Sequence, residues 1–162
     1  MKVTFTRIRE RAYGVSVEGP NIETKEMSPA PGYDDRLPHD AAHFIVENEL
    51  GILGGVFGQL AAGGTANTYF SPDSKSPKKD RRRGKQISKE NKKDALFSEH
   101  AVWAAQSRWE KHDIIPDTKI SKEDLDRIIQ KFEAFAEMWS KTRVGESVTL
   151  DWNPRTSRKR SR

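Results

Sequence analysis

Histidine and carboxylate side chains recur at four-residue intervals in the stretch "LPHDAAHFIVENELGILGG", residues 37–55. His39, His43 and Glu47 carry this spacing. A helix turns by about 100° per residue, so these three side chains would fall within a sector of about 80°. Imidazoles at positions i and i+4 can direct ring nitrogens at one centre, as they do on the zinc-binding helices of metalloproteases. The spacing therefore predicts a site for zinc or another divalent metal ion, with His39, His43 and Glu47 as ligands.

Two more carboxylates, Asp40 and Glu99, belong to the same hypothesis. Asp40 lies in the first turn of the expected helix, where it is a helix cap, a hydrogen-bond partner for an imidazole or a general base. Glu99 lies in the middle of the apolar face of a second expected helix, where a charged group needs a partner. We expect Glu99 to be a further metal ligand. Asp40 or Glu47 is then the catalytic base of a metal-dependent hydrolase that acts on an unidentified small molecule.

An alternative interpretation needs no metal. Ala42, Val46 and Leu50 share the side of the helix that carries the histidines, so this side is predicted to face the core. Buried polar groups are nearly always hydrogen-bonded, so His39, His43 and Glu47 would then form a network within a packed structure. The sequence contains no cysteine, which excludes disulfides and thiolate ligands and leaves His, Asp and Glu as candidate ligands.

Positive charge is concentrated in two segments. Residues 75–93 hold ten Lys and Arg against Asp80 and Glu90, a net charge of +8, and residues 155–162 hold five Lys and Arg and no acid. Since the whole chain carries +5, the remainder carries −8. Basic segments of this kind are either solvated, unstructured runs or contacts for nucleic acid, so nucleic-acid binding through 75–93 and 155–162 is one of two interpretations. The alternative function is thus a non-enzymatic interaction protein that binds nucleic acid or a protein partner.

The elements that must position these residues follow from hydrophobic periodicity. Residues 1–18 alternate apolar and polar side chains as a β-hairpin does, and "SVTLDW", residues 147–152, does so as a last strand. Helical spacing favours helices over residues 38–50 and 92–112, and a third that begins after Ser121 as N-cap. The predicted fold is α+β: a small antiparallel sheet, made of the N-terminal hairpin and the C-terminal strand, covered by about three helices.

One domain is expected over residues 1–154, with a basic tail at 155–162. Residues 71–91 are polar and basic and lack apolar periodicity, so they are predicted to be a disordered insert. No apolar run approaches the roughly 18 residues of a membrane span. The charged start "MKVTFTRIRE" is unlike a signal peptide, so we expect a cytoplasmic protein that does not enter a membrane.

The 28 residues "LPHDAAHFIVENELGILGGVFGQLAAGG" resemble a family of small uncharacterised bacterial proteins. Their shared pattern is PHD-x-x-HF-x-VE-x-x-LG followed by a glycine-rich apolar stretch, and the later "VGESVTLDW" is also similar to theirs. The core "HDAAH" is similar to the HD-x-x-H zinc motif of a ubiquinone-biosynthesis protein family. That motif continues with a glutamate twelve residues after its second histidine, where this chain has Gly55. The first resemblance implies a bacterial protein in which this helix carries the family's motif. The second implies that the helix binds zinc.

Overall fold

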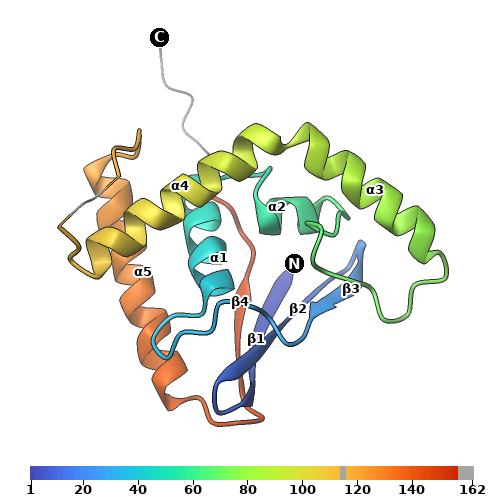
Figure 1. Ribbon diagram of the computed structural model, residues 1–162, viewed down its shortest axis with the longest axis horizontal. Coiled ribbons are helices and arrows are strands. Elements are labelled where there is room, and N and C mark those ends of the chain that lie inside the picture. The colour runs from blue at the N-terminus through green and yellow to red at the C-terminus, as the bar shows by residue number, and fades with distance from the viewer. Residues whose placement is uncertain (114–115, 157–162) are drawn as a thin grey trace.

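The computed structural model describes residues 1–113 and 116–156 (Figure 1). A four-stranded antiparallel sheet with the strand order β3-β2-β1-β4 forms its base. The strands are β1 (Lys2–Arg9), β2 (Ala12–Gly19), β3 (Ile22–Met27) and β4 (Ser147–Asp151). Val3 faces Val17 across the β1–β2 pair, and Phe5 faces Val148 across the β1–β4 pair. The expected hairpin and C-terminal strand are therefore neighbours in one sheet.

The two faces of this sheet differ because side chains alternate along each strand. Val3 and Phe5 in β1 are fully buried on one face. On the other face, the Thr4 hydroxyl lies 2.9 Å from the Thr149 hydroxyl, and the Thr6 hydroxyl lies 2.8 Å from that of Ser147, in two hydrogen bonds that are exposed to solvent. The hydrophobic core thus lies on one side of the sheet.

Helices cover the apolar face. The described residues contain five: α1 (His39–Leu50), α2 (Val56–Ala61), α3 (Pro77–Glu90), α4 (Lys92–Trp109) and α5 (Lys122–Lys141). The Phe5 ring contacts Phe44 of α1, Phe57 of α2 and Phe135 of α5, with centroid distances of 6.2, 6.5 and 5.4 Å. α4 packs on α1 and α5. The predicted α+β fold, a small antiparallel sheet covered by helices, is confirmed.

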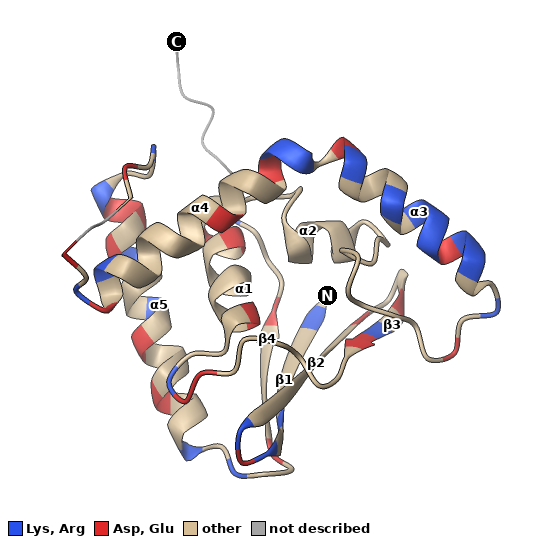
Figure 2. Cartoon of the chain, viewed as in Figure 1, with Lys and Arg blue, Asp and Glu red and all other residues tan. Residues whose placement is uncertain are grey.

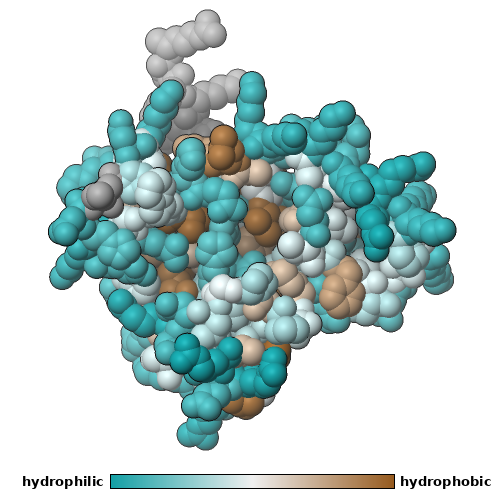
Figure 3. All heavy atoms as spheres, viewed as in Figure 1, coloured by the Kyte–Doolittle hydropathy of each residue, from teal (hydrophilic) through white to brown (hydrophobic). Residues whose placement is uncertain are grey.

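The structure corrects the prediction of disorder at residues 71–91, because Pro77–Glu90 forms helix α3. α3 leads directly into α4, and together they make a bent arm across one side of the molecule (Figure 1). Figure 2 shows that Lys and Arg gather along α3, and Figure 3 shows a hydrophilic surface there. Gly84 is the buried residue of α3, so the helix has no apolar face for the sequence to show.

α3 is fixed to the body of the protein by polar contacts. The Ser88 hydroxyl donates to Oε1 of Gln59 in α2 at 2.8 Å, and the Arg83 guanidinium donates to the Ala62 carbonyl at 3.1 Å. A Cβ on Gly84 would lie 2.2 Å from the Thr65 hydroxyl, so only glycine allows this approach. Residues 157–162 of the predicted basic tail lie outside the described residues. Within the described part, none of the helices combines the length and the apolar character needed to cross a membrane.

Candidate metal centre

Three of the four predicted ligands meet between helices α1 and α4. His39, His43 and Glu99 each offer one ligand atom, and these atoms lie within 4.8 Å of one another. Nε2 of His43 lies 3.4 Å from Oε2 of Glu99, and the two imidazole centroids are 4.7 Å apart. Ligand atoms around one zinc ion are about 3.3 Å apart, since zinc–ligand bonds of about 2.0–2.2 Å meet at tetrahedral angles. The group could therefore hold a metal ion after small side-chain shifts.

The three side chains differ in exposure. His43 is only 2% exposed, whereas the Glu99 side chain is 60% exposed and His39 is also exposed. Partial desolvation of its ring lowers the pKa of His39, and the nearby His43 lowers it further. Hydrogen bonding to His43 lowers the pKa of Glu99 despite its partial burial. The group thus combines a buried imidazole with two ligands that face solvent.

Hydrogen bonds on the far side of His43 determine which of its nitrogens is free. The Ser98 hydroxyl donates its only proton to Oε1 of Glu47 at 2.7 Å, because a carboxylate can only accept. Nδ1 of His43, 3.2 Å from the same hydroxyl, must then be the donor and carry a proton. In the neutral imidazole, Nε2 keeps its lone pair and faces Glu99. This is the arrangement by which a second group orients a metal-binding histidine.

Protonation of His43 competes with any metal ion. Burial alone would lower the pKa of His43, but the hydrogen bonds and charges of Glu47 and Glu99 outweigh burial and raise the pKa to about 9. Without a metal ion, His43 is therefore an imidazolium between two carboxylates near neutral pH. The same geometry allows an ion pair when His43 is protonated and a metal site when His43 is neutral, so the two states of His43 differ by one proton.

Glu47 does not join the metal-binding group. Its fully buried carboxylate accepts hydrogen bonds from the backbone N–H groups of Val56 and Phe57, both at 2.8 Å, in addition to the Ser98 hydroxyl. It lies 3.6 Å from Nδ1 of His43, whereas Glu99 is next to Nε2. Glu47 therefore caps the N-terminus of α2 and contacts His43 on the side away from Glu99, so its contacts favour a structural role over the expected role as a ligand.

Gly55 is the residue that makes this cap possible. An added Cβ would lie 2.2 Å from Oε1 of Glu47, and the buried, hydrogen-bonded carboxylate cannot move aside. We expect Gly55→Ala to lower the free energy of unfolding by about 2–3 kcal/mol, as overpacking in a core does. Urea denaturation measures this. Gly19→Ala is the control, since its Cβ would meet nothing closer than 3.3 Å. Equal stability of the two variants would contradict the tight fit at Gly55.

The Asp40 carboxylate is also engaged in hydrogen bonds within the protein. Its buried carboxylate accepts a hydrogen bond from the Tyr13 hydroxyl at 2.6 Å and faces the Tyr69 hydroxyl at 3.4 Å. Burial raises the pKa of Asp40, although both tyrosines and the histidines oppose this. Asp40 makes no cap hydrogen bond to α1 and joins this helix to strand β2 instead. The predicted catalytic roles of Asp40 and Glu47 stay predictions, and the contacts of both favour structural roles.

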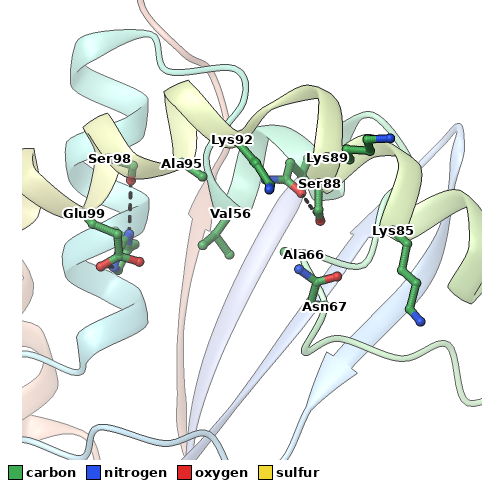
Figure 4. Close-up of a pocket in the computed structure, with 12 residues that line it drawn as sticks. Val56, Ala66, Asn67, Lys85, Ser88, Lys89, Lys92, Ala95, Ser98 and Glu99 are labelled. Atoms are coloured by element: carbon green, nitrogen blue, oxygen red, sulfur yellow. Dashed lines mark hydrogen bonds and ion pairs between the residues drawn. The ribbon is translucent and has the colours of Figure 1, made fainter.

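A pocket of about 440 Å³ opens beside the metal-binding group. His43, Ser98 and Glu99 line one end, and Lys85 and Lys89 of α3 line the other. Figure 4 shows Glu99 and Lys85 on opposite sides of the pocket. Comparison with protein-family models, curated proteins and solved structures found no match. The site itself therefore carries the functional argument.

Sequence reasoning missed Ser98 and the lysines of the pocket. Ser98 lies next to Glu99 in the chain, but its partner Glu47 is 51 positions away. Only the packing of α4 on α1 brings them together. The lysines belong to the segment that was expected to be disordered, so no position relative to the histidines was predicted.

Proposed function

We propose that the protein binds a divalent metal ion, preferably zinc, through His39, His43 and Glu99. The observation that carries this proposal is the convergence of their ligand atoms within 4.8 Å, with Nε2 of His43 oriented by the Ser98–Glu47 hydrogen bonds. Two imidazoles and one carboxylate are a common ligand set of catalytic zinc sites. The first test is elemental analysis of protein purified without a histidine tag. It should show about one zinc per chain, and a metal-free protein that does not bind added zinc would overturn the proposal.

The hydrolase activity is the finer part of the proposal. Three protein ligands would leave one coordination position of a zinc ion open to water, and the ion would lower the pKa of that water to about 7. The adjoining pocket gives a substrate access to His43 and Glu99 from one side. His43 is held by Ser98, so it presents a fixed nitrogen to the ion. Hydrolysis of an ester or phosphoester that is lost with a chelator and restored by zinc would support this activity.

The affinity for zinc should depend strongly on pH. His43 must lose the proton that its pKa of about 9 retains at neutral pH, so each unit of pH below 9 weakens binding about tenfold. From pH 8 to pH 6 we expect about a 100-fold loss of affinity, and release of about one proton per zinc at pH 7. Calorimetry in buffers of different ionisation enthalpy measures both. A pH-independent affinity would contradict His43 as a ligand.

In the metal-free protein, a rise in pH has the opposite effect: it lowers the stability of the fold. The folded-state pKa of His43 lies above its ordinary value of 6.5, so the charged form stabilises the fold fully below pH 6.5. This contribution is lost as the pH rises through about 9. Metal-free protein should therefore become less stable from pH 7 to pH 9.5, while zinc-loaded protein should lose less.

The alternative function, nucleic-acid binding by a non-enzymatic protein, is favoured by one observation. Helix α3 carries seven Lys and Arg against Asp80 and Glu90, and Figure 2 shows these basic residues along the length of the helix. Phosphate contacts of this kind release counterions, so binding would weaken steeply with salt. An affinity for mixed-sequence oligonucleotides that falls with salt but ignores zinc and His39→Gln would favour this alternative over the metal enzyme.

A further inference from the structure

The pocket beside the metal-binding group is one end of a longer cleft. A second pocket, of about 370 Å³, shares Asn67 and Lys85 with the first. The second pocket lies between helix α3 and the segment 65–71 that precedes it, and the first is lined in addition by residues of α1, α2 and α4. The cleft thus runs from Glu99 of α4 at one end, past α3, to Phe70 at the other.

The middle of the cleft is cationic. Lys85, Lys89 and Lys92 line the first pocket, and Arg81 joins Lys85 in the second. The ion pairs found among the described residues engage none of these four side chains. Cations that lack a protein partner and line one cavity favour an anion with several oxygens, such as a phosphate group. Figure 4 shows Lys85, Lys89 and Lys92 around the same pocket as Glu99.

The far end of the cleft offers an aromatic ring. Phe70 lines the second pocket and is 50% exposed, which is unusual for so large an apolar side chain. Its backbone N–H and carbonyl pair with Glu26 of β3 at 3.0 and 2.8 Å, so the ring is attached to the edge of the sheet. Exposed aromatic side chains next to cations are the platforms on which nucleic-acid bases stack. Asp80, the acid of this pocket, lies here and accepts a hydrogen bond from Ser74.

We propose that this cleft binds a nucleotide, with its phosphate on Lys85, Lys89 and Lys92 and its base on Phe70. The inference rests on the proposed metal site in one respect, because it places the phosphate next to His43 and Glu99 and so gives that site a substrate class. The nucleotide itself is held by residues that are not metal ligands. The bound group is either a free nucleotide or the terminal nucleotide of a nucleic-acid strand.

The test is a titration of the ¹⁵N-labelled, metal-free full chain, followed by NMR. Adenosine monophosphate should shift the amide signals of Asn67 and Lys85 and bind at least about tenfold more tightly than inorganic phosphate or adenosine alone. Phe70→Ser should weaken binding of the nucleotide about tenfold and leave binding of inorganic phosphate unchanged. The double variant Lys85→Gln/Lys89→Gln should weaken both ligands.

Two matched controls lie outside the cleft. Lys93→Gln removes a neighbouring exposed lysine, and Leu53→Ser removes a side chain that is 63% exposed, so neither should change binding. The proposal is overturned if phosphate and nucleotide bind equally, if Phe70→Ser has no effect, or if the controls weaken binding as much. A 5′-phosphorylated single strand that binds more tightly than the mononucleotide, with the same dependence on Phe70, identifies a strand end as the source. Weaker binding of the strand identifies a free nucleotide.

The outcome is separable from that of the metal proposal. If zinc does not bind but nucleotide binding depends on Phe70 and the lysines, the metal proposal is wrong and the proposal for the cleft is supported. If zinc binds and the nucleotide does not, the cleft fails and the metal site stands. When both hold, zinc and nucleotide should strengthen each other's binding by the same factor, because coupling between two sites is reciprocal.

Discussion

Zinc binding is expected to fall at least about 100-fold when His43 is replaced by glutamine. Glutamine has a similar length and can still meet the Ser98 hydroxyl, but its amide is a poor zinc ligand. The remaining His39 and Glu99 are both exposed, so two ligands would retain only weak affinity. Competition with a chromogenic chelator measures the dissociation constant.

Two further variants make this result interpretable. His39→Gln removes a ligand that is exposed, so it should abolish tight zinc binding while leaving the melting temperature of the metal-free protein nearly unchanged. His112→Gln removes a histidine that pairs with Glu110 at the end of α4 and should bind zinc as the original chain does. If both His39→Gln and His43→Gln retain full affinity, the metal site is wrong and the histidines serve packing and the ion pair alone.

Glu47→Ala is expected to cause the largest loss of stability, about 3–5 kcal/mol. The change leaves the buried donors Phe57 N–H and Ser98 hydroxyl, and the partly buried Val56 N–H, without their acceptor. It also removes one of the two carboxylates that neutralise a protonated His43. Urea denaturation of the metal-free protein measures the loss.

Ser98→Ala separates the cap from the support of His43. It should lower the free energy of unfolding by less than Glu47→Ala does, about 1–2 kcal/mol, because Glu47 keeps its two backbone donors. It should nevertheless weaken zinc binding about tenfold, since Nδ1 of His43 loses its acceptor. Glu137→Ala is the exposed control and should change little, because Glu137 pairs only with Lys141 at the surface. A Glu47→Ala variant as stable as Glu137→Ala would contradict the capping role.

The sheet and the helices that bury an apolar stripe were predictable because periodicity reports burial. The start of α5 was predicted at Ser121, and the structure shows its hydroxyl accepting from the Asp124 N–H at 3.1 Å. Helix α3 was missed because it contacts the protein through Gly84 and polar side chains, which leave no hydrophobic pattern. Propensity alone is weak evidence for a helix so rich in charge.

The candidate site was predictable only as far as side-chain spacing reports it. His39 and His43 lie on one helix, so their convergence follows from a four-residue interval. Glu47 shares that interval, but spacing cannot distinguish a ligand from a helix cap when both explain a buried acid. A signal was present in Gly54 and Gly55, which precede α2 and provide no side-chain cap of their own. The pairing of Ser98 with Glu47 depends on tertiary packing and had no local signal.

The position of β1 in the sheet has a consequence for the order in which the fold is completed. β1 is paired on both sides, and one of its partners is β4, so Lys2 lies opposite Asp151. A chain made from its N-terminus forms the β1–β2 hairpin early, but β1 remains an edge strand until almost all described residues exist. Closing so long a loop is slow, and an uncovered edge invites pairing with another chain during that interval. Synthesis rate and chaperone access should therefore affect the yield of this protein more than its final stability suggests.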